Sequence, residues 1–209
     1  MDEPRWVAWA REIQALAQTG LTYARDPYDR DRYTRLQTLA AEIMAEYTGI
    51  QVQQLEMLFA RETGYATPKL DVRGAVFRGD RVLLVREKAD SDRWTLPGGW
   101  ADVNESPTEA LAKEVREEAG VEVRITKLAA VWDRAKHGHR PLHPFHIWKL
   151  FFLCEEVGGK PRPGPETSEV AFFTEETLPT ELSIGRVLLP QLKRMFAHMR
   201  QPALPTEFD

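Results

Sequence analysis

The feature that most constrains this chain is a short helix whose two ends are set by local chemistry. Ser106-Pro-Thr-Glu109 forms a capping box with proline in the first helical position, and Gly120 is suited to end the helix in a left-handed conformation. The sequence therefore predicts a helix over residues 107–119. At about 100° per residue, three glutamates share one side of it, and an apolar arc beside them is expected to face a sheet. The glutamates are Glu114, Glu117 and Glu118, the arc is Leu111, Ala112, Val115 and Ala119, and Ala110 would leave room beside the carboxylates.

Carboxylates spaced i, i+3 and i+4 repel one another, at about 0.2–0.5 kcal/mol for each like-charge pair on an exposed helix. Their closeness to the helix C-terminus adds to that cost. A hard divalent cation such as Mg²⁺ or Mn²⁺ would turn the repulsion into binding, because these ions take oxygen ligands. The alternative is a solvated charged face in which Lys113 pairs with Glu109 and Glu117. On the helix alone the two interpretations carry similar weight.

The surrounding spacing resembles the Nudix box, G-x5-E-x7-R-E-U-x-E-E-x-G-U, where U is a bulky aliphatic residue. The match runs in register through Gly99, Glu105, Glu114, Val115, Glu117, Glu118, Gly120 and Val121. Lys113 stands where the pattern has arginine, which keeps the charge but loses the bidentate fork. The chain also resembles one Nudix subgroup, in which this lysine is usual and a helical N-terminal domain comes first. That subgroup is similar to bacterial CDP-choline pyrophosphatase and includes ADP-ribose pyrophosphatases. The further residues that carry this likeness are Gly64-Tyr65, Thr67-Pro68-Lys69 and the segment 94–102.

The resemblance implies an α/β fold, a Nudix α/β/α sandwich with a mixed β-sheet, preceded by a small all-helical N-terminal domain. The helical domain would cover residues 1–65 and the Nudix hydrolase domain residues 66–205. The implied enzyme is a metal-dependent pyrophosphohydrolase acting on a nucleoside diphosphate linked to a group X, of the CDP-choline or ADP-ribose class. Its products would be a nucleoside monophosphate and X-phosphate.

The resemblance also implies roles for single residues. Mg²⁺ or Mn²⁺ would be held by Glu114, Glu117, Glu118 and the carbonyl of Gly98. Glu105 would orient this cluster, and Glu118 is the first candidate for assisting deprotonation of the attacking water. In some family members the base comes from a later loop, where Glu166 and Glu169 are the candidates here, although each is also an ordinary surface acid.

Positive groups are expected near an anionic substrate. Between Arg134 and Cys154 the chain has no acidic residue, and Arg134, His139 and Arg140 lie in this stretch. Arg86 and Arg93 flank the glycine loop and could also reach phosphate. A plain solvated loop is the alternative, and so is a zinc site built from His137, His139, His143 and His146, which matches no familiar finger spacing. Cys154 is expected to be a small buried residue and not a nucleophile.

Apolar periodicity predicts three helices before Gly64. The first ends at Gly20, the second begins at Asp26-Pro27, and the third follows Ile50. Helices of this size bury little surface alone, so they should pack on a second copy as a homodimer or help to shape a substrate pocket. Later strands are expected at residues 71–77, 81–86, 125–132, 145–154 and 170–173, and a final helix at 185–199 with Pro190 as a kink or break.

The charge balance restricts the partners. The chain of 209 residues carries 28 Lys+Arg against 32 Asp+Glu, a net charge of -4, which argues against a membrane surface or nucleic acid as the main partner. A single cysteine fits a cytoplasmic location. An alternative function is a non-catalytic nucleotide sensor that uses the same fold, but such a protein would be expected to lose the box glutamates, and all of them are present here.

Overall fold

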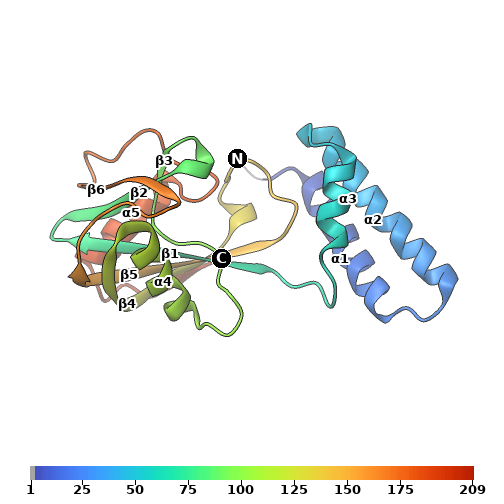
Figure 1. Ribbon diagram of the computed structural model, residues 1–209, viewed down its shortest axis with the longest axis horizontal. Helices are drawn as coiled ribbons and strands as arrows, with labels where there is room; N and C mark the ends of the chain where they lie inside the picture. Colours follow the sequence, from blue (N-terminus) through green and yellow to red (C-terminus); the bar gives the residue numbers. More distant parts are fainter. Residues whose placement is uncertain (1–2) are drawn as a thin grey trace. The chain divides into compact units, whose positions relative to one another are not determined.

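The computed structural model describes residues 3–209, which form two compact units (Figure 1). The helical unit contains the chain through Lys69 together with Leu142–His146, and the sheet unit contains Leu70–Pro141 and Ile147–Asp209. In chain order the elements are α1 (Arg5–Tyr23), α2 (Pro27–Thr48), α3 (Val52–Ala60), β1 (Lys69–Arg78), β2 (Arg81–Glu87), η1 (Lys88–Asp90), β3 (Arg93–Thr95), α4 (Pro107–Ala119), β4 (Val121–Asp133), η2 (Arg134–Lys136), β5 (Ile147–Gly159), β6 (Thr167–Phe173), α5 (Leu189–Arg200) and β7 (Glu207–Phe208).

The helical unit forms because three amphipathic segments bury their apolar faces against one another. The Asp26 side chain accepts hydrogen bonds from the backbone of Tyr28 and Asp29 at the start of α2, and Gly49 ends that helix with φ 73°. The buried core of the unit is made of Val7, Ala10, Ala40, Ala41, Met44, Leu55 and Phe59. Three helices were expected here from the sequence, and the described residues of the unit form three.

The expected end of the first helix was wrong. Helix α1 continues through Gly20 to Tyr23. A Cβ atom at Gly20 would lie 2.4 Å from the ring of Tyr33, so glycine is required there by the close approach of α2. The cost of a glycine inside a helix, about 1 kcal/mol, is offset by this packing.

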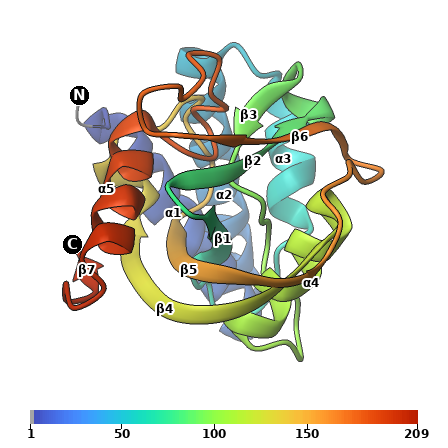
Figure 2. The ribbon, with the colours of Figure 1, turned by 90° about the vertical axis from the view of Figure 1, so that its left-hand side faces the viewer.

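The sheet unit is built around a seven-stranded mixed sheet with the order β3-β2-β1-β5-β4-β7, and β6 pairs with β2. The long β4–β5 pair is antiparallel and β4–β7 is parallel. Figure 2 shows α4 and α5 on opposite sides of this sheet. The α/β/α sandwich with a helical N-terminal region, expected from the sequence, is confirmed.

Each face of the sheet has its own core. Helix α4 covers one face with Ala110, Leu111, Val115 and Ala119. Helix α5 covers the other with Leu192, Met195 and Phe196. Ala110 is fully buried in the first core, so the expectation that it leaves open space beside the carboxylates was wrong. Cys154 is buried in the same core as expected, and burial raises the pKa of its thiol to about 12.

The last helix also differs from its expectation. Helix α5 begins at Leu189, and Pro190 lies in its first turn instead of inside the helix. A proline in the first turn costs no hydrogen bond, because the backbone N–H groups there have no partner within the helix. Residues 185–188 therefore precede the helix. None of the described helices combines the length and the apolar character that crossing a membrane requires.

Candidate active site

Helix α4 is held by the local chemistry that the sequence indicates. The Ser106 side chain accepts from the backbone N–H of Glu109, the Glu109 side chain accepts from the backbone N–H of Ser106, and Gly120 ends the helix with φ 69°. Because these caps depend only on neighbours in the chain, they fix the two ends of α4 and with them which side chains share one face of the helix.

The loop before α4 runs beside β1 and has glycine at two points of close approach, of which Gly98 requires it. Val72 N–H donates to the Gly99 carbonyl over 2.8 Å, and Gly74 N–H donates to the Pro97 carbonyl over 2.9 Å. Gly98 has φ 136°, and a Cβ there would lie 2.0 Å from the Val72 carbonyl oxygen. A Cβ at Gly99 would lie 3.2 Å from the Glu114 carboxylate. The two glycines thus let the backbone approach both the strand and the helix carboxylates.

Two of the three helix carboxylates are withdrawn from water. Glu118 is 5% exposed, and its Oε2 accepts from the Gly98 N–H over 2.8 Å. Burial raises the pKa of Glu118 to about 7, although Arg73 opposes the shift. Burial also raises the pKa of Glu114, while Glu117 is exposed. A site that raises carboxylate pKa values in this way would be stabilised by a cation.

Lys113 on α4 binds two acidic residues of the segment that precedes the helix. The Lys113 ammonium donates to Asp102 over 2.8 Å and to Glu105 Oε1 over 2.9 Å, and these bonds raise the pKa of Lys113. The lysine that replaces arginine in the box therefore still holds Glu105, through one oxygen. The other oxygen, Oε2, is buried without a hydrogen-bond partner. An unused buried carboxylate oxygen is a spare acceptor for a cation or for a proton donor on a ligand.

The donor set fits a divalent cation by its chemistry. It consists of carboxylates with raised pKa values and an unpartnered oxygen, and oxygen is the ligand that Mg²⁺ and Mn²⁺ prefer. In this conformation, however, residues 3–209 contain no group of at least three His, Cys, Asp or Glu side chains that could together hold a metal ion. Glu118 is engaged by Gly98 and Glu105 by Lys113, so ligation would require side-chain rotation.

A later loop, residues 160–167, lies along the C-terminal end of α4. Arg162 N–H donates to the Ala119 carbonyl over 2.9 Å, Gly164 N–H to the Glu118 carbonyl over 3.3 Å, and the Thr167 hydroxyl to the same Glu118 carbonyl over 2.6 Å. These bonds satisfy carbonyls that the helix itself leaves without partners. They also bring Glu166 close enough to Glu114 to raise its pKa.

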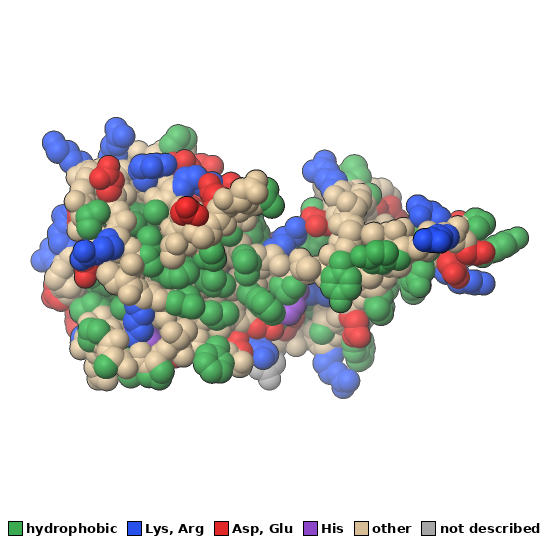
Figure 3. All heavy atoms as spheres, turned by 90° about the horizontal axis from the view of Figure 1, so that it is seen from below, with side chains coloured by type: hydrophobic (Ala, Val, Ile, Leu, Met, Phe, Trp, Pro, Cys, Tyr) green, Lys and Arg blue, Asp and Glu red, His purple; other side chains and the backbone are tan. Residues whose placement is uncertain are grey.

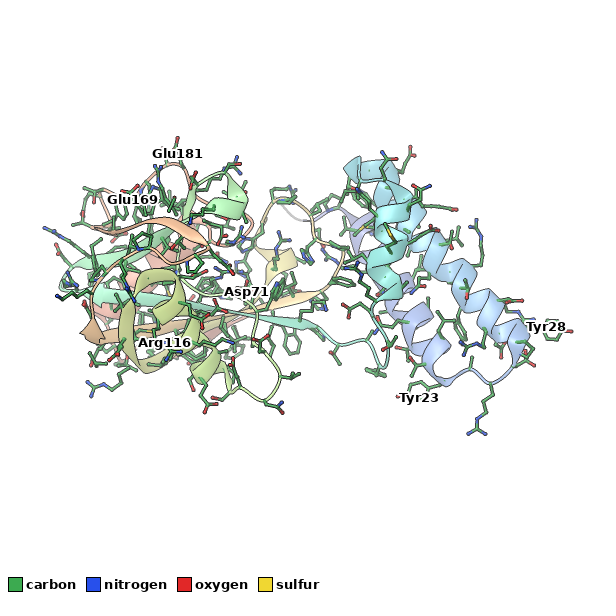
Figure 4. The ribbon with its side chains drawn as sticks, in the orientation of Figure 1. Tyr23, Tyr28, Asp71, Arg116, Glu169 and Glu181 are labelled. Atoms are coloured by element: carbon green, nitrogen blue, oxygen red, sulfur yellow. The ribbon has the colours of Figure 1, made fainter. Side chains whose placement is uncertain are left out.

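The two later acids therefore differ in position. Glu166 lies near the helix carboxylates, whereas Glu169 pairs with Arg86, with 3.4 Å between its Oε2 and the arginine Nε. Arg86 also faces Glu181, with 3.7 Å between NH2 and Oε2, and lies over the ring of Trp94. Figure 4 shows Glu169 and Glu181 on the same side of the sheet unit. Arg93 pairs with Asp90 over 3.6 Å.

Hydrogen bonds to neighbouring backbone and side chains hold the basic stretch after β4 in place. His139 is 2% exposed; its Nδ1 lies 2.9 Å from the Ile184 carbonyl and its Nε2 3.1 Å from Gln191. Burial lowers the pKa of His139 to about 3, so the ring is neutral and positions a turn. Arg134 donates to the Pro141 carbonyl, and Arg140 donates to the His139 carbonyl. His137 lies 3.0 Å from Asp209.

Sequence reasoning missed a buried ionic cluster on β1 and β5. Arg73 donates to both oxygens of Asp71 over 2.9 and 2.8 Å, and Lys149 donates to Asp71 over 2.6 Å. Burial alone would raise the pKa of Asp71, but Arg73 and Lys149 lower it. Burial lowers the pKa of Lys149 to about 8. Alternation in Asp71-Val-Arg73 puts both charges on one face of the strand, which was the available signal.

Comparison with known proteins defines the class. Residues 67–192 match the model of the NUDIX domain, and residues 4–59 match the model described as a UDP-X-like, N-terminal oligomerisation domain. The chain belongs to the Nudix hydrolase family and is an enzyme of that family.

Its relatives make the likeness more specific. The chain is 44% identical over 207 residues to the Bacillus subtilis protein YjhB, whose name gives ADP-ribose pyrophosphatase as a provisional activity, and the match covers 99% of this chain and 98% of that one. The crystal structure of a UDP-X diphosphatase is 30% identical with a TM-score of 0.63, and the match covers all of both chains. An ADP-ribose pyrophosphatase from Streptococcus suis is 38% identical with a TM-score of 0.61, over 68% of this chain and all of that one.

Proposed function

We propose that this enzyme hydrolyses the diphosphate of a nucleoside diphosphate linked to a group X, releasing a nucleoside monophosphate and X-phosphate. The observation that carries the proposal is the pair of desolvated carboxylates, Glu114 and Glu118, held against the Gly98-Gly99 loop in the Nudix box. ADP-ribose is the first candidate substrate because two relatives carry that activity in their names. The UDP-X diphosphatase adds uridine derivatives, and CDP-choline remains a candidate through the subgroup resemblance.

The residues that would hold Mg²⁺ or Mn²⁺ are Glu114, Glu117 and Glu118, with the Gly98 carbonyl. Nudix hydrolases generally use divalent metal ions, and such an ion would supply charge for the diphosphate and acidify a bound water. Glu118 would take the proton of the attacking water, since its carboxylate lies in a buried position with a pKa near neutrality. Glu166 is the second candidate for that role, and Glu105 would orient the cluster through its unpartnered oxygen.

Among the five basic residues expected near the substrate, direct contacts are proposed for Arg86, Arg93 and Arg140, and indirect roles for Arg134 and His139. Arg86 is best suited of these to meet the diphosphate, because its Nε is buried without a hydrogen bond and its carboxylate partners stand at 3.4 and 3.7 Å. His139 and Arg134 would act by shaping the loop, since both are buried. For the whole chain we propose a helical domain at 1–65, a Nudix domain at 66–205, a homodimer and a cytoplasmic location.

A substrate screen tests the proposal. The protein is incubated with ADP-ribose, CDP-choline and UDP-sugars in Mg²⁺, in Mn²⁺ and in excess chelator, and the products are separated by chromatography. We expect nucleoside monophosphate from at least one substrate, only with metal. Glu118→Gln should lower kcat by about 10²–10⁴-fold with an unchanged circular dichroism spectrum.

Glu122→Gln is the matched control, because Glu122 is exposed on β4, and it should retain full activity. Turnover in excess chelator, or full turnover by Glu118→Gln, would overturn the mechanism. Tight binding of a nucleotide without any turnover would instead favour the sensor, the alternative function.

A further inference from the structure

Helix α1 is apolar on two opposite faces. Its inner face packs in the core of the helical unit through Val7, Ala10 and Ala17. Its outer face carries three large apolar side chains at intervals of seven residues, Trp9, Leu16 and Tyr23, which are 53%, 58% and 66% exposed. Residues seven apart drift by only about 20° around a helix, so the three form one line, here called the outer seam. Single exposed apolar residues are ordinary, but a continuous line marks an interaction surface.

A groove lies beside one end of this seam. It has a volume of about 410 Å³, and the ring of Tyr33 packs directly on the backbone of Gly20, where a Cβ would otherwise lie. The groove is lined by Leu16, Thr19, Gly20, Tyr23, Ala24, Asp29 and Tyr33. The seam thus presents a projecting ring, Trp9, at one end and a hollow at the other.

We propose that two copies of this chain pair through their outer seams, with the α1 helices antiparallel about a two-fold axis at Leu16, so that Trp9 of each copy enters the groove beside Tyr23 of the other. The numbering supports this register, since Trp9 and Tyr23 are each seven residues from Leu16. A two-fold axis at Leu16 therefore brings each projecting ring to the partner's hollow, about 10 Å along the helix from the axis at 1.5 Å per residue. Figure 3 shows hydrophobic side chains at the surface of the helical unit.

The charges on the seam favour the antiparallel arrangement. In a parallel pair, Arg5 would face Arg5 and Glu12 would face Glu12 of the other copy, and facing like charges are destabilising. In the antiparallel pair Glu12 faces the position of Gly20, where the Tyr33 ring lies, and meets no like charge. Arg5 faces the turn after α1, where Asp29 lines the groove.

The matched family model is described as an oligomerisation domain, but it assigns neither a surface nor a symmetry. This inference rests on the proposed homodimer and adds both. Tyr28, 72% exposed near the end of the groove, would be covered by the N-terminal end of the second α1. Figure 4 shows Tyr23 and Tyr28 pointing out of the helical unit. These rings add area toward the roughly 1,200–2,000 Å² of a stable interface.

Cysteine cross-linking tests the register, because the one native cysteine, Cys154, is buried. A disulfide needs Cα atoms within about 7 Å. Leu16→Cys should therefore form a cross-linked dimer of twice the 24.0 kDa chain mass under mild oxidation. Trp9→Cys alone should not, whereas the double variant Trp9→Cys with Tyr23→Cys should. Met57→Cys is the matched control, since Met57 on α3 is 58% exposed like Leu16 but lies off the seam.

The outcomes separate the surface from the dimer. Cross-linking of Trp9→Cys alone would indicate a parallel pair and overturn the register. Light scattering that shows a dimer in which Leu16→Cys links no better than Met57→Cys would overturn the seam while the dimer stands. A monomeric protein at micromolar concentration would overturn both, with the hydrolysis unaffected. As a second measure, Leu16→Asp should raise the dimer dissociation constant at least 100-fold, and Met57→Asp should change it less than threefold.

Discussion

The two units differ in what they bury and in what they leave exposed. The sheet unit buries charge: Asp71, Arg73, Glu118 and Lys149 are each at most 6% exposed. In the described part of the helical unit, the buried polar side chains are the neutral amides Gln14 and Gln18. That unit instead exposes large apolar side chains along α1. Buried charge is costly unless it is paired, and exposed apolar surface is costly unless it is covered. The difference agrees with the hydrolysis proposed for the sheet unit and with the pairing of two copies proposed for the helical unit.

Two arginines, one in each unit, test directly whether the two units differ in how they bury charge. Arg73 in the sheet unit and Arg11 in the helical unit each form a two-point bond to a carboxylate, Asp71 and Glu3 respectively. Arg73→Met should cost about 3–5 kcal/mol of unfolding free energy, because it leaves buried charge with too few partners. Arg11→Met should cost less, about 1–3 kcal/mol, because the Arg11 and Glu3 side chains are 11% and 10% exposed against 4% and 8% for Arg73 and Asp71. Arg11 also donates to the His143 carbonyl, and that bond is lost with the Glu3 pair.

Urea unfolding followed by circular dichroism measures both losses. Lys149 stays beside Asp71 in the Arg73→Met variant, so the cost is that of an unbalanced cluster and not of a fully isolated acid. Equal losses for the two variants would show that burial of charge does not distinguish the units.

The sequence indicated those parts of the site whose chemistry is local. Helix α4 was predicted to the residue because its capping box and its Gly120 cap involve only neighbours in the chain. The buried cluster was missed because Lys149 meets Asp71 across 78 positions, a distance at which no local pattern operates. The role of Gly20 was misjudged for the same reason, since glycine is needed there to make room for the ring of Tyr33 on another helix.

The pH dependence of stability should also separate the units. Burial lowers the pKa of His139 in the sheet unit from 6.5 to about 3. Between these values the unfolded chain binds a proton that the folded chain does not. Keeping His139 neutral therefore costs nothing above pH 6.5. Below pH 6.5 the free energy of unfolding falls by about 1.4 kcal/mol per pH unit because of this group.

The contribution of His139 must be measured by comparing variants, because the raised pKa of Glu118 increases stability as the pH falls from 7 to 4.5. His139→Asn should flatten the loss between pH 6.5 and 5 relative to the parent protein, measured by urea unfolding at each pH. His146→Asn is the control in the helical unit, because His146 is exposed. If both variants change the free energy of unfolding by the same amount at every pH, so that its slope against pH is that of the parent protein, His139 is not held neutral in the folded chain.

The smallest expected effect concerns a hydroxyl that joins two parts of the site. Thr167 Oγ1 donates to the Glu118 carbonyl over 2.6 Å and accepts from the Gly164 N–H over 2.8 Å. Removing it in Thr167→Val should loosen the 160–167 loop from α4 and cost about 1–1.5 kcal/mol, or about tenfold in kcat, with KM little changed. Thr167→Ser should restore activity, because it keeps the hydroxyl.

Thr126→Val removes a similar bond on β4, to the Leu153 carbonyl, and should lower stability without lowering kcat. If both valine variants lose kcat in proportion to their stability, Thr167 serves the fold alone. If Thr167→Val alone loses kcat, its hydroxyl holds Glu166 and Glu118 in register, and the sheet unit depends for its chemistry on a contact that the sequence did not indicate.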